Sequence, residues 1–171
     1  MGFGILIFGY FLSFAFSISQ YYFFTDIIGA VIMLVAFSKL SEYNRYYIGA
    51  SWACLGFLIL CSTNAAAMMF PLYDPTGPID FAVDVLKLVS GSVMHVCVFL
   101  GIRGIAMGAL AHQISAKAQR NMVMTGMYYF ASLVVILTSS LMPKEMSYYA
   151  GLSVYFYWLL CIFLNLILIY N

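Results

Sequence analysis

Charged side chains are scarce in this chain. Of its 171 residues only 8% are Asp, Glu, Lys or Arg, whereas soluble domains carry about 25%. The hydrophobic share is 65%, more than the core of a soluble fold of this length could bury. The net charge of +1 leaves no basic face for nucleic acid. The composition therefore predicts an integral membrane protein whose partner is the lipid bilayer, with no nucleic acid.

Motifs of the common enzyme and metal sites are missing as well. The sequence contains no HExxH, no GxSxG and no phosphate-binding lysine motif. Four cysteines, Cys54, Cys61, Cys97 and Cys161, lie in apolar runs and form no CxxC pair. Cysteine in such a run behaves as a small hydrophobe. We therefore expect no enzymatic activity, no metal site, no cofactor and no disulfide framework.

Proline is rare inside the apolar runs, because three of the four prolines fall between Pro71 and Pro78. The runs are continuously apolar, whereas the strands of a membrane barrel alternate apolar and polar residues. We therefore expect an all-α integral membrane protein, a bundle of about six transmembrane helices in one polytopic domain, residues 1–171. The expected spans are about 2–19, 25–40, 46–70, 80–111, 121–142 and 149–170.

Basic side chains gather in alternate loops. Lys39, Arg45, Lys117 and Arg120 lie in the loops after the second and fourth spans, whereas the other side has only Lys144, with Lys87 close by. Cytoplasmic loops carry the excess of lysine and arginine in membrane proteins. The pattern therefore predicts a multi-pass protein of the cell membrane with both termini in the cytoplasm.

The fourth span is the one that carries many ionisable residues. At about 100° per residue, Asp80, Asp84, Lys87, Gly91 and His95 fall within an arc of roughly 80° on one helix face. Ionisable groups in a membrane usually face the protein interior or a wet cavity. The stripe therefore predicts a ligand-binding site. The alternative is that the first three residues lie in the outer interface, paired with each other and partly solvated.

His95 is the deepest ionisable residue of this stripe. We expect its binding site to include Asp84 and Lys87 of the same span, Asn64 of the third span and Asn165 of the sixth. Asn165 stands in an apolar run, so its amide needs a partner inside the bundle. The simpler alternative is that His95 makes one interhelical hydrogen bond, for example to Asn64 or Asn165, and binds nothing.

Small residues mark a second face of the fourth span. Gly101, Gly104 and Gly108 lie on it, and Gly49 and Ala53 form a similar pair on the third span. The small-xxx-small spacing lets helix backbones approach closely in lipid. We expect these residues to pack helices together, either within the chain or against another membrane protein or a second copy.

Two functions fit these features. The first is a ligand-binding or transport subunit with a polar site between helices near the fourth span, since ligand pockets occur between the helices of bundles. Six spans in 171 residues are similar in outline to the substrate-capture subunits of vitamin transporters, although no motif carries that likeness. The alternative is a non-catalytic membrane anchor, sensor or assembly partner.

Overall fold

A computed structural model describes residues 2–15, 22–68, 78–139 and 141–170. Within these residues the chain forms six α-helices and no strand, so the predicted all-helical class is confirmed. The helices are α1 (Gly2–Ala15), α2 (Tyr22–Leu40), α3 (Tyr46–Met68), α4 (Pro78–Gly108), α5 (His112–Thr138) and α6 (Lys144–Tyr170).

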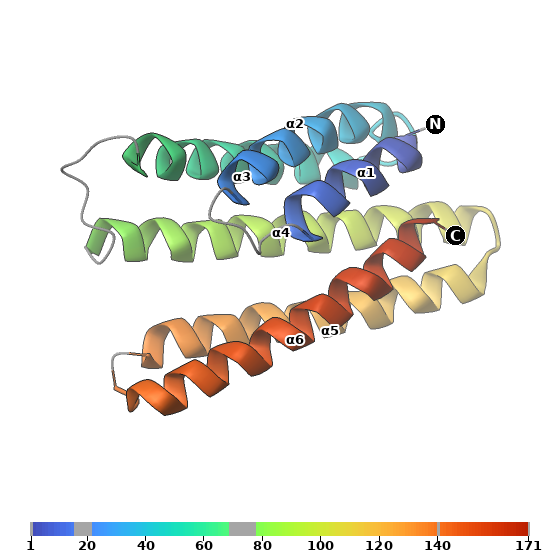
Figure 1. Cartoon of the computed structure of the whole chain (residues 1–171). Coiled ribbons are helices and arrows are strands. Elements are labelled where there is room, and N and C mark those ends of the chain that lie inside the picture. The colour runs from blue at the N-terminus through green and yellow to red at the C-terminus, as the bar shows by residue number, and fades with distance from the viewer. Residues whose placement is uncertain (1, 16–21, 69–77, 140, 171) are drawn as a thin grey trace.

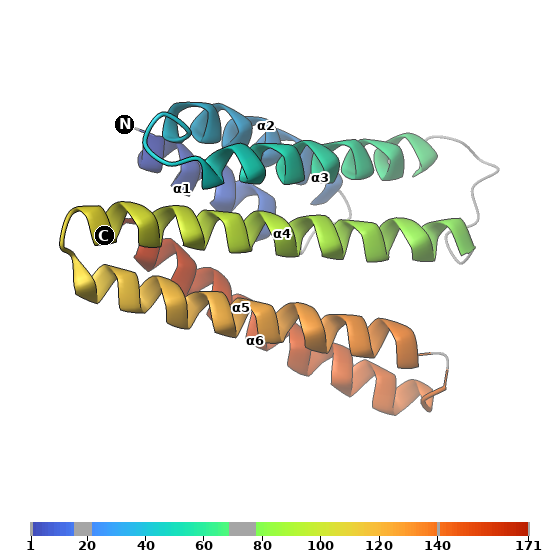
Figure 2. The same cartoon turned by 180° about the vertical axis from the view of Figure 1, so that it is seen from behind.

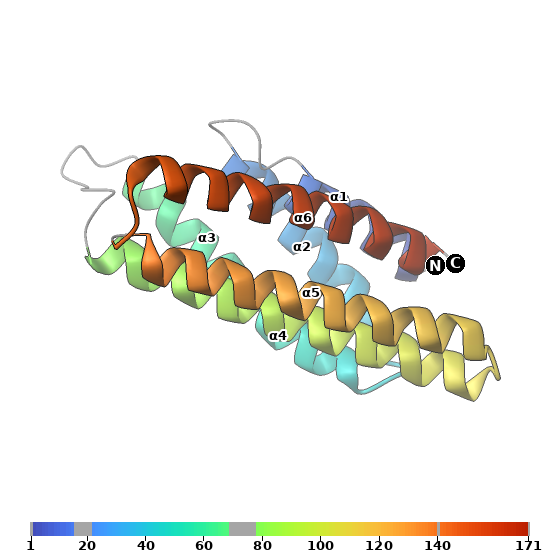
Figure 3. The ribbon, with the colours of Figure 1, turned by 90° about the horizontal axis from the view of Figure 1, so that it is seen from below.

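The helices form a closed up-and-down bundle (Figure 1). Each helix packs against the next one along the chain, and α6 packs back against α1. The start of α1, the end of α6 and the turn between α4 and α5 lie at one end of the bundle, as Figure 3 also shows. From behind, α4 runs the length of the molecule between α3 and α5 (Figure 2). The stripe on α4 can therefore meet residues from both halves of the chain.

Membrane crossing is feasible for four of the described helices by length and composition. The apolar segments that qualify are Tyr46–Thr63, Phe81–Gly108, His112–Thr138 and Lys144–Tyr170. The 14 residues of α1 make a shorter apolar helix of about 21 Å, against about 30 Å of hydrocarbon. Four such helices support a membrane protein, whereas the expected count of six spans stays a prediction.

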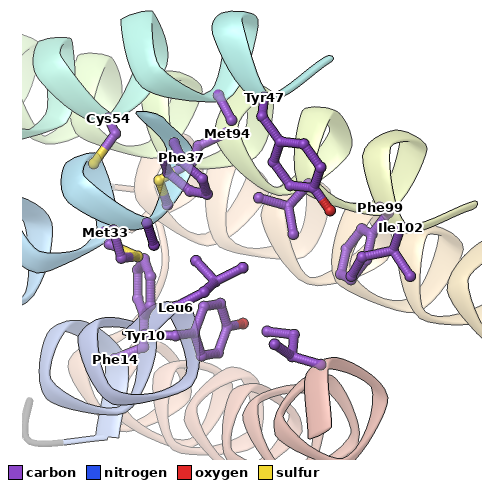
Figure 4. Close-up of a cluster of buried hydrophobic side chains, with 14 of the residues drawn as sticks. Leu6, Tyr10, Phe14, Met33, Phe37, Tyr47, Cys54, Met94, Phe99 and Ile102 are labelled. Atoms are coloured by element: carbon purple, nitrogen blue, oxygen red, sulfur yellow. The ribbon is translucent and has the colours of Figure 1, made fainter. Parts of the chain in front are cut away.

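Apolar side chains fill the inside of the bundle and also cover its outside. The buried cluster joins α1 to α4, with Leu6 and Tyr10 meeting Met33, Phe37 and their neighbours (Figure 4). On the outer surface Trp52 is 71% exposed and Phe130 is 69% exposed. Large apolar side chains on both sides are what a helix bundle in lipid requires, because lipid tails are themselves apolar.

The turn between α4 and α5 is shorter than the sequence predicted. The polar residues from His112 to Gln119, expected as a connection, are the first two turns of α5. The prediction was wrong because alanine, glutamine and lysine form helix well and can end a membrane helix in water. A Schellman turn closes α4, with the Ala111 amide donating to the Ala106 carbonyl at 2.8 Å and Leu110 at φ 56°.

Backbones approach closely where α1 crosses α2. A Cβ added at Gly29 would lie 2.6 Å from the Ser13 nitrogen and 2.7 Å from the Gly9 oxygen. A Cβ added at Gly9 would lie 2.9 Å from the Gly29 oxygen. Main-chain atoms cannot move aside as a flexible side chain can, so only glycine fits this crossing. The sequence analysis did not select these two glycines.

The glycines selected on α4 have different neighbours. A Cβ at Gly101 would lie 2.7 Å from the Tyr47 ring, and one at Gly104 would meet the Asn44 amide of the turn before α3. On α3, a Cβ at Gly49 would lie 3.1 Å from Cys97 Sγ. A Cβ at Gly108 would meet nothing within 4 Å in the part of the chain that the structure describes. Gly108 lies one turn beyond Gly104, and its face of α4 has no packing neighbour among the described residues.

Ala53 of α3 takes part in the same contact through its main chain. Its carbonyl oxygen accepts a hydrogen bond of 2.7 Å from the Ser90 hydroxyl of α4. A small side chain at position 53 leaves this carbonyl within reach of the neighbouring helix.

Candidate functional site

His95 lies in the middle of α4 and is only 2% exposed. Both of its ring nitrogens are hydrogen-bonded: Nε2 is 2.8 Å from the Tyr10 hydroxyl, and Nδ1 is 2.8 Å from the Gly91 carbonyl oxygen. The Tyr129 hydroxyl lies 2.9 Å from the same Nδ1. Elements α1, α4 and α5 therefore meet at this imidazole.

The partners of His95 fix its tautomer. A carbonyl oxygen can only accept, so Nδ1 carries the proton and donates to Gly91, and the Tyr129 hydroxyl oxygen accepts a share of the same proton. Nε2 is then an acceptor and receives the hydroxyl proton of Tyr10. The ring is neutral in this arrangement, because a second ring proton would face the Tyr10 donor.

Two asparagines extend these contacts to the far side of the bundle. The Asn165 amide donates to the Tyr10 hydroxyl at 2.8 Å and to Thr125 Oγ1 at 3.2 Å. The Asn121 amide donates to the Leu164 carbonyl at 2.9 Å and to Asn165 Oδ1 at 3.2 Å. We refer to this set as the His95 network. Its members are Tyr10, His95, Asn121, Thr125, Tyr129 and Asn165.

The His95 network joins α1, α4, α5 and α6, and it is suited to holding helices rather than to moving protons. Every side chain in it has at least one hydrogen-bond partner. A proton relay needs groups that both gain and lose protons, and the two amides keep theirs. Leaving one buried polar group unpaired costs about 1–3 kcal/mol, so a completed network favours this one arrangement of helices.

A cavity of about 390 Å³ lies next to the His95 network, toward the end of the bundle where α4 begins. All six helices contribute to its wall. The lining residues are Ser13, Phe14, Asp26, Phe57, Asp84, Lys87, Leu88, Gly91, Tyr128, Tyr129, Ile136 and Trp158.

The polar stripe predicted on α4 runs along this cavity. Asp84, Lys87 and Gly91 line it, as the arc on the helical wheel suggests. His95 itself does not line the cavity. Gly91 and Tyr129, which do line it, are both hydrogen-bonded to His95 and lie between the imidazole and the cavity. Asn165 does not line the cavity and reaches His95 only through Tyr10.

Asn64 of α3, which the sequence also placed in the site, has its side chain outside the described part of the structure. No contact with His95 or with the cavity is therefore assigned to it.

The sequence analysis missed Asp26, the acidic residue that α2 contributes to the cavity. Its side chain is only 6% exposed. Its Oδ1 has no hydrogen-bond partner among the described residues. Lys87 lies close enough to act on this carboxyl group through its charge. An acid one turn inside an apolar helix was the signal available in the sequence.

Four members of the His95 network were also missed. On α5, Asn121, Thr125 and Tyr129 are buried at intervals of four residues, which is the spacing of one helix face. That signal was lost because the sequence analysis placed the start of the span at Asn121. Tyr10 left no comparable signal, since tyrosine is common in apolar helices.

Aromatic rings form much of the cavity wall. The rings of Phe14 and Trp158 meet edge to face at 5.5 Å, and those of Tyr128 and Trp158 stack at 4.3 Å. Phe57 lies 5.9 Å from Phe14. The cavity thus combines a few charged groups with a rigid aromatic surface, a composition found in pockets for small molecules.

The chain matches no protein-family model, no curated protein and no solved structure. Its function is therefore inferred from its own residues and their geometry.

Proposed function

We propose that this chain is a multi-pass protein of the cell membrane that binds a small ligand in the cavity between its six helices, as a ligand-binding or transport subunit. The observation that carries the proposal is the buried carboxyl oxygen of Asp26 at the cavity wall, which has no partner among the described residues. Buried polar groups are nearly always hydrogen-bonded, so such an exception requires an explanation. A ligand that completes the group is the simplest explanation.

The orientation predicted from the basic residues would put this cavity on the outer side. Glu42 and Arg45 lie in the turn between α2 and α3, at the end of the bundle opposite the cavity. If the basic turns face the cytoplasm, as the positive-inside rule predicts, the termini are cytoplasmic and the cavity opens outward. The His95 network then forms a layer between the cavity and the cytoplasmic half. Passage through the bundle would require this layer to open.

The second candidate function is a membrane anchor, sensor or assembly partner without catalysis. The exposed Gly108 favours it, because part of the glycine face finds no neighbour within the described chain and remains open to a second copy or another membrane protein. We assign no enzymatic activity to either candidate, since the sequence carries no catalytic motif.

Access to the cavity can be tested with an introduced thiol. Leu88 lines the cavity, whereas Ile162 of α6 is 4% exposed and does not. We expect Leu88→Cys in membrane vesicles to react with a small water-soluble thiol reagent added from the outer side. Ile162→Cys should react only after unfolding. The parent protein gives the background of the native cysteines.

The binding proposal fails if Leu88→Cys stays unreactive in the folded protein while the unfolded variant reacts fully. Such a result would leave the anchor or assembly role as the better explanation, because a closed cavity admits no ligand.

A further inference from the structure

One carboxyl oxygen of Asp26 lacks a hydrogen bond to the described residues around it. The Ser13 hydroxyl donates to the Asp26 main-chain carbonyl at 3.4 Å rather than to the carboxyl group. The carboxyl oxygen Oδ1 is left without a hydrogen bond among the described residues. A carboxylate removed from water is stable only when a donor or a positive charge compensates it. The wall of the cavity therefore presents an acceptor that a ligand can complete.

Lys87 only partly compensates the acids of the cavity. Its Nζ lies 5.9 Å from the centre of the Phe57 ring, and its charge acts on Asp26 without a hydrogen bond to Oδ1. Counted by formal charge, Asp26 and Asp84 contribute −2 and Lys87 contributes +1, so the lining side chains sum to −1. A ligand of charge +1 would bring the cavity to neutrality.

The aromatic wall favours an organic cation. Phe14, Tyr128 and Trp158 lie around the cavity and contact one another. The faces of aromatic rings are electron-rich and attract ammonium groups, most strongly where water is excluded. A hydrated metal ion gains less from contact with aromatic rings. Within the described residues, no group of three His, Cys, Asp or Glu side chains is placed to hold a metal.

We propose that the cavity binds a small organic monocation, a protonated amine with an apolar body, and that Asp26 is its counter-ion. This inference rests on the proposed ligand-binding function and names its ligand class. The ammonium group pairs with the carboxyl group of Asp26, whose buried Oδ1 turns toward the cavity to accept its hydrogen bond, and the apolar body lies against Trp158 and Phe14. The volume of about 390 Å³ falls within the range of pockets for small molecules.

Three probes of one shape and different charge test the ligand class: 2-phenylethylammonium, 2-phenylethanol and 3-phenylpropanoate. The chain has two tryptophans, and Trp158 lines the cavity whereas Trp52 is 71% exposed on α3. Fluorescence of the Trp52→Phe protein in zwitterionic vesicles therefore reports on the cavity. The Trp158→Phe protein, which keeps only Trp52, controls for partition of the probes into lipid.

We expect the cation to bind at least about tenfold more tightly than the neutral alcohol, because a hydrogen bond to a charged group is among the stronger ones. The anion should bind more weakly than the alcohol. Asp26→Asn should remove the preference for the cation, whereas Glu42→Gln should retain it, because Glu42 is an exposed acid at the opposite end of the bundle.

The inference is overturned if the alcohol or the anion binds as well as the cation, or if Asp26→Asn keeps the full preference. It is also overturned if none of the three probes changes the Trp158 signal. In that last case reaction of Leu88→Cys would still support a ligand cavity, so failure of the ligand class and failure of the proposed function are distinguishable. The comparison of three probes on unaltered Asp26 decides the matter even if Asp26→Asn does not fold.

Discussion

The His95 network and the neighbouring cavity differ in how their buried polar groups are partnered. In the network, both nitrogens of His95 and the amide of Asn165 have hydrogen-bond partners on other helices. In the cavity, the Asp26 oxygen Oδ1 has none among the described residues, although Asp26 is nearly as buried as His95. A completed network stabilises one helix arrangement, whereas an unpartnered carboxyl group lowers stability unless a ligand binds. Mutations in the network should therefore lower the free energy of unfolding, whereas removing the charge at Asp26 should raise it.

The largest effect is expected at the crossing of α1 and α2, which supports both regions. Gly29→Ala should lower the free energy of unfolding by about 3 kcal/mol, because the added Cβ meets main-chain atoms of Ser13 and Gly9. Gly126→Ala is the matched control, since its Cβ meets nothing within 4 Å among the described residues and alanine favours helix by about 1 kcal/mol. Denaturant unfolding in detergent measures both. Equal stability of the two variants would contradict the close approach of the α1 and α2 backbones at Gly29.

A smaller loss is expected from the His95 network. His95→Leu should lower the free energy of unfolding by about 2 kcal/mol, because the Tyr10 hydroxyl and the Gly91 carbonyl lose their partner. His95→Gln should lose less, since an amide can still donate and accept. Melting temperatures of the two variants give the comparison. A His95→Leu protein that melts with the parent would show that these bonds do not hold the bundle.

The same two variants test whether His95 transfers protons or contacts the ligand directly. Because His95 does not line the cavity, we expect folded His95→Gln to bind the cationic probe as the parent does at every pH tested. A folded His95→Gln protein with altered pH dependence of binding would place this imidazole in the ligand path instead.

At the cavity we expect a mutation to raise the free energy of unfolding rather than lower it. Asp26→Asn should raise the free energy of unfolding of the ligand-free protein by about 1 kcal/mol, because a neutral amide is less costly to bury than a carboxylate whose Oδ1 has no hydrogen-bond partner among the described residues. Asp84→Asn is the control, since Asp84 lines the same cavity but is exposed, and it should change stability little. Loss of stability in Asp26→Asn would indicate that the carboxyl group has a partner within the protein.

Orientation can be checked without changing stability. Leu141 is 83% exposed and Leu110 is 77% exposed, in turns at opposite ends of the bundle. Leu141→Cys should react with a membrane-impermeant thiol reagent only from outside, and Leu110→Cys only from inside, because the basic residues predict this orientation. Labelling of both variants from one side would contradict the membrane topology.

The helix stripe on α4 could be predicted because its residues are close in sequence. Asp84, Lys87 and Gly91 share one face by the 3.6-residue period alone, and all three line the cavity. Asp26 and Tyr10 could not be found in this way, since they lie on two other helices and reach the site only when the bundle has folded. The crossing at Gly9 and Gly29 was missed for the same reason, because the two glycines form a contact only once α1 has folded back on α2.

The sequence by itself determined that this protein is a bundle of apolar helices, because hydrophobicity and helical period act locally and need no partner. The tertiary structure alone decided which polar groups meet. Tyr10 and Asn165 stand 155 positions apart, yet their hydrogen bond of 2.8 Å links the first helix to the last. Whether a buried polar group is satisfied or left for a ligand depends on such distant neighbours. The closed ring of six helices gives His95 its partners and leaves the Asp26 oxygen with none among the described residues.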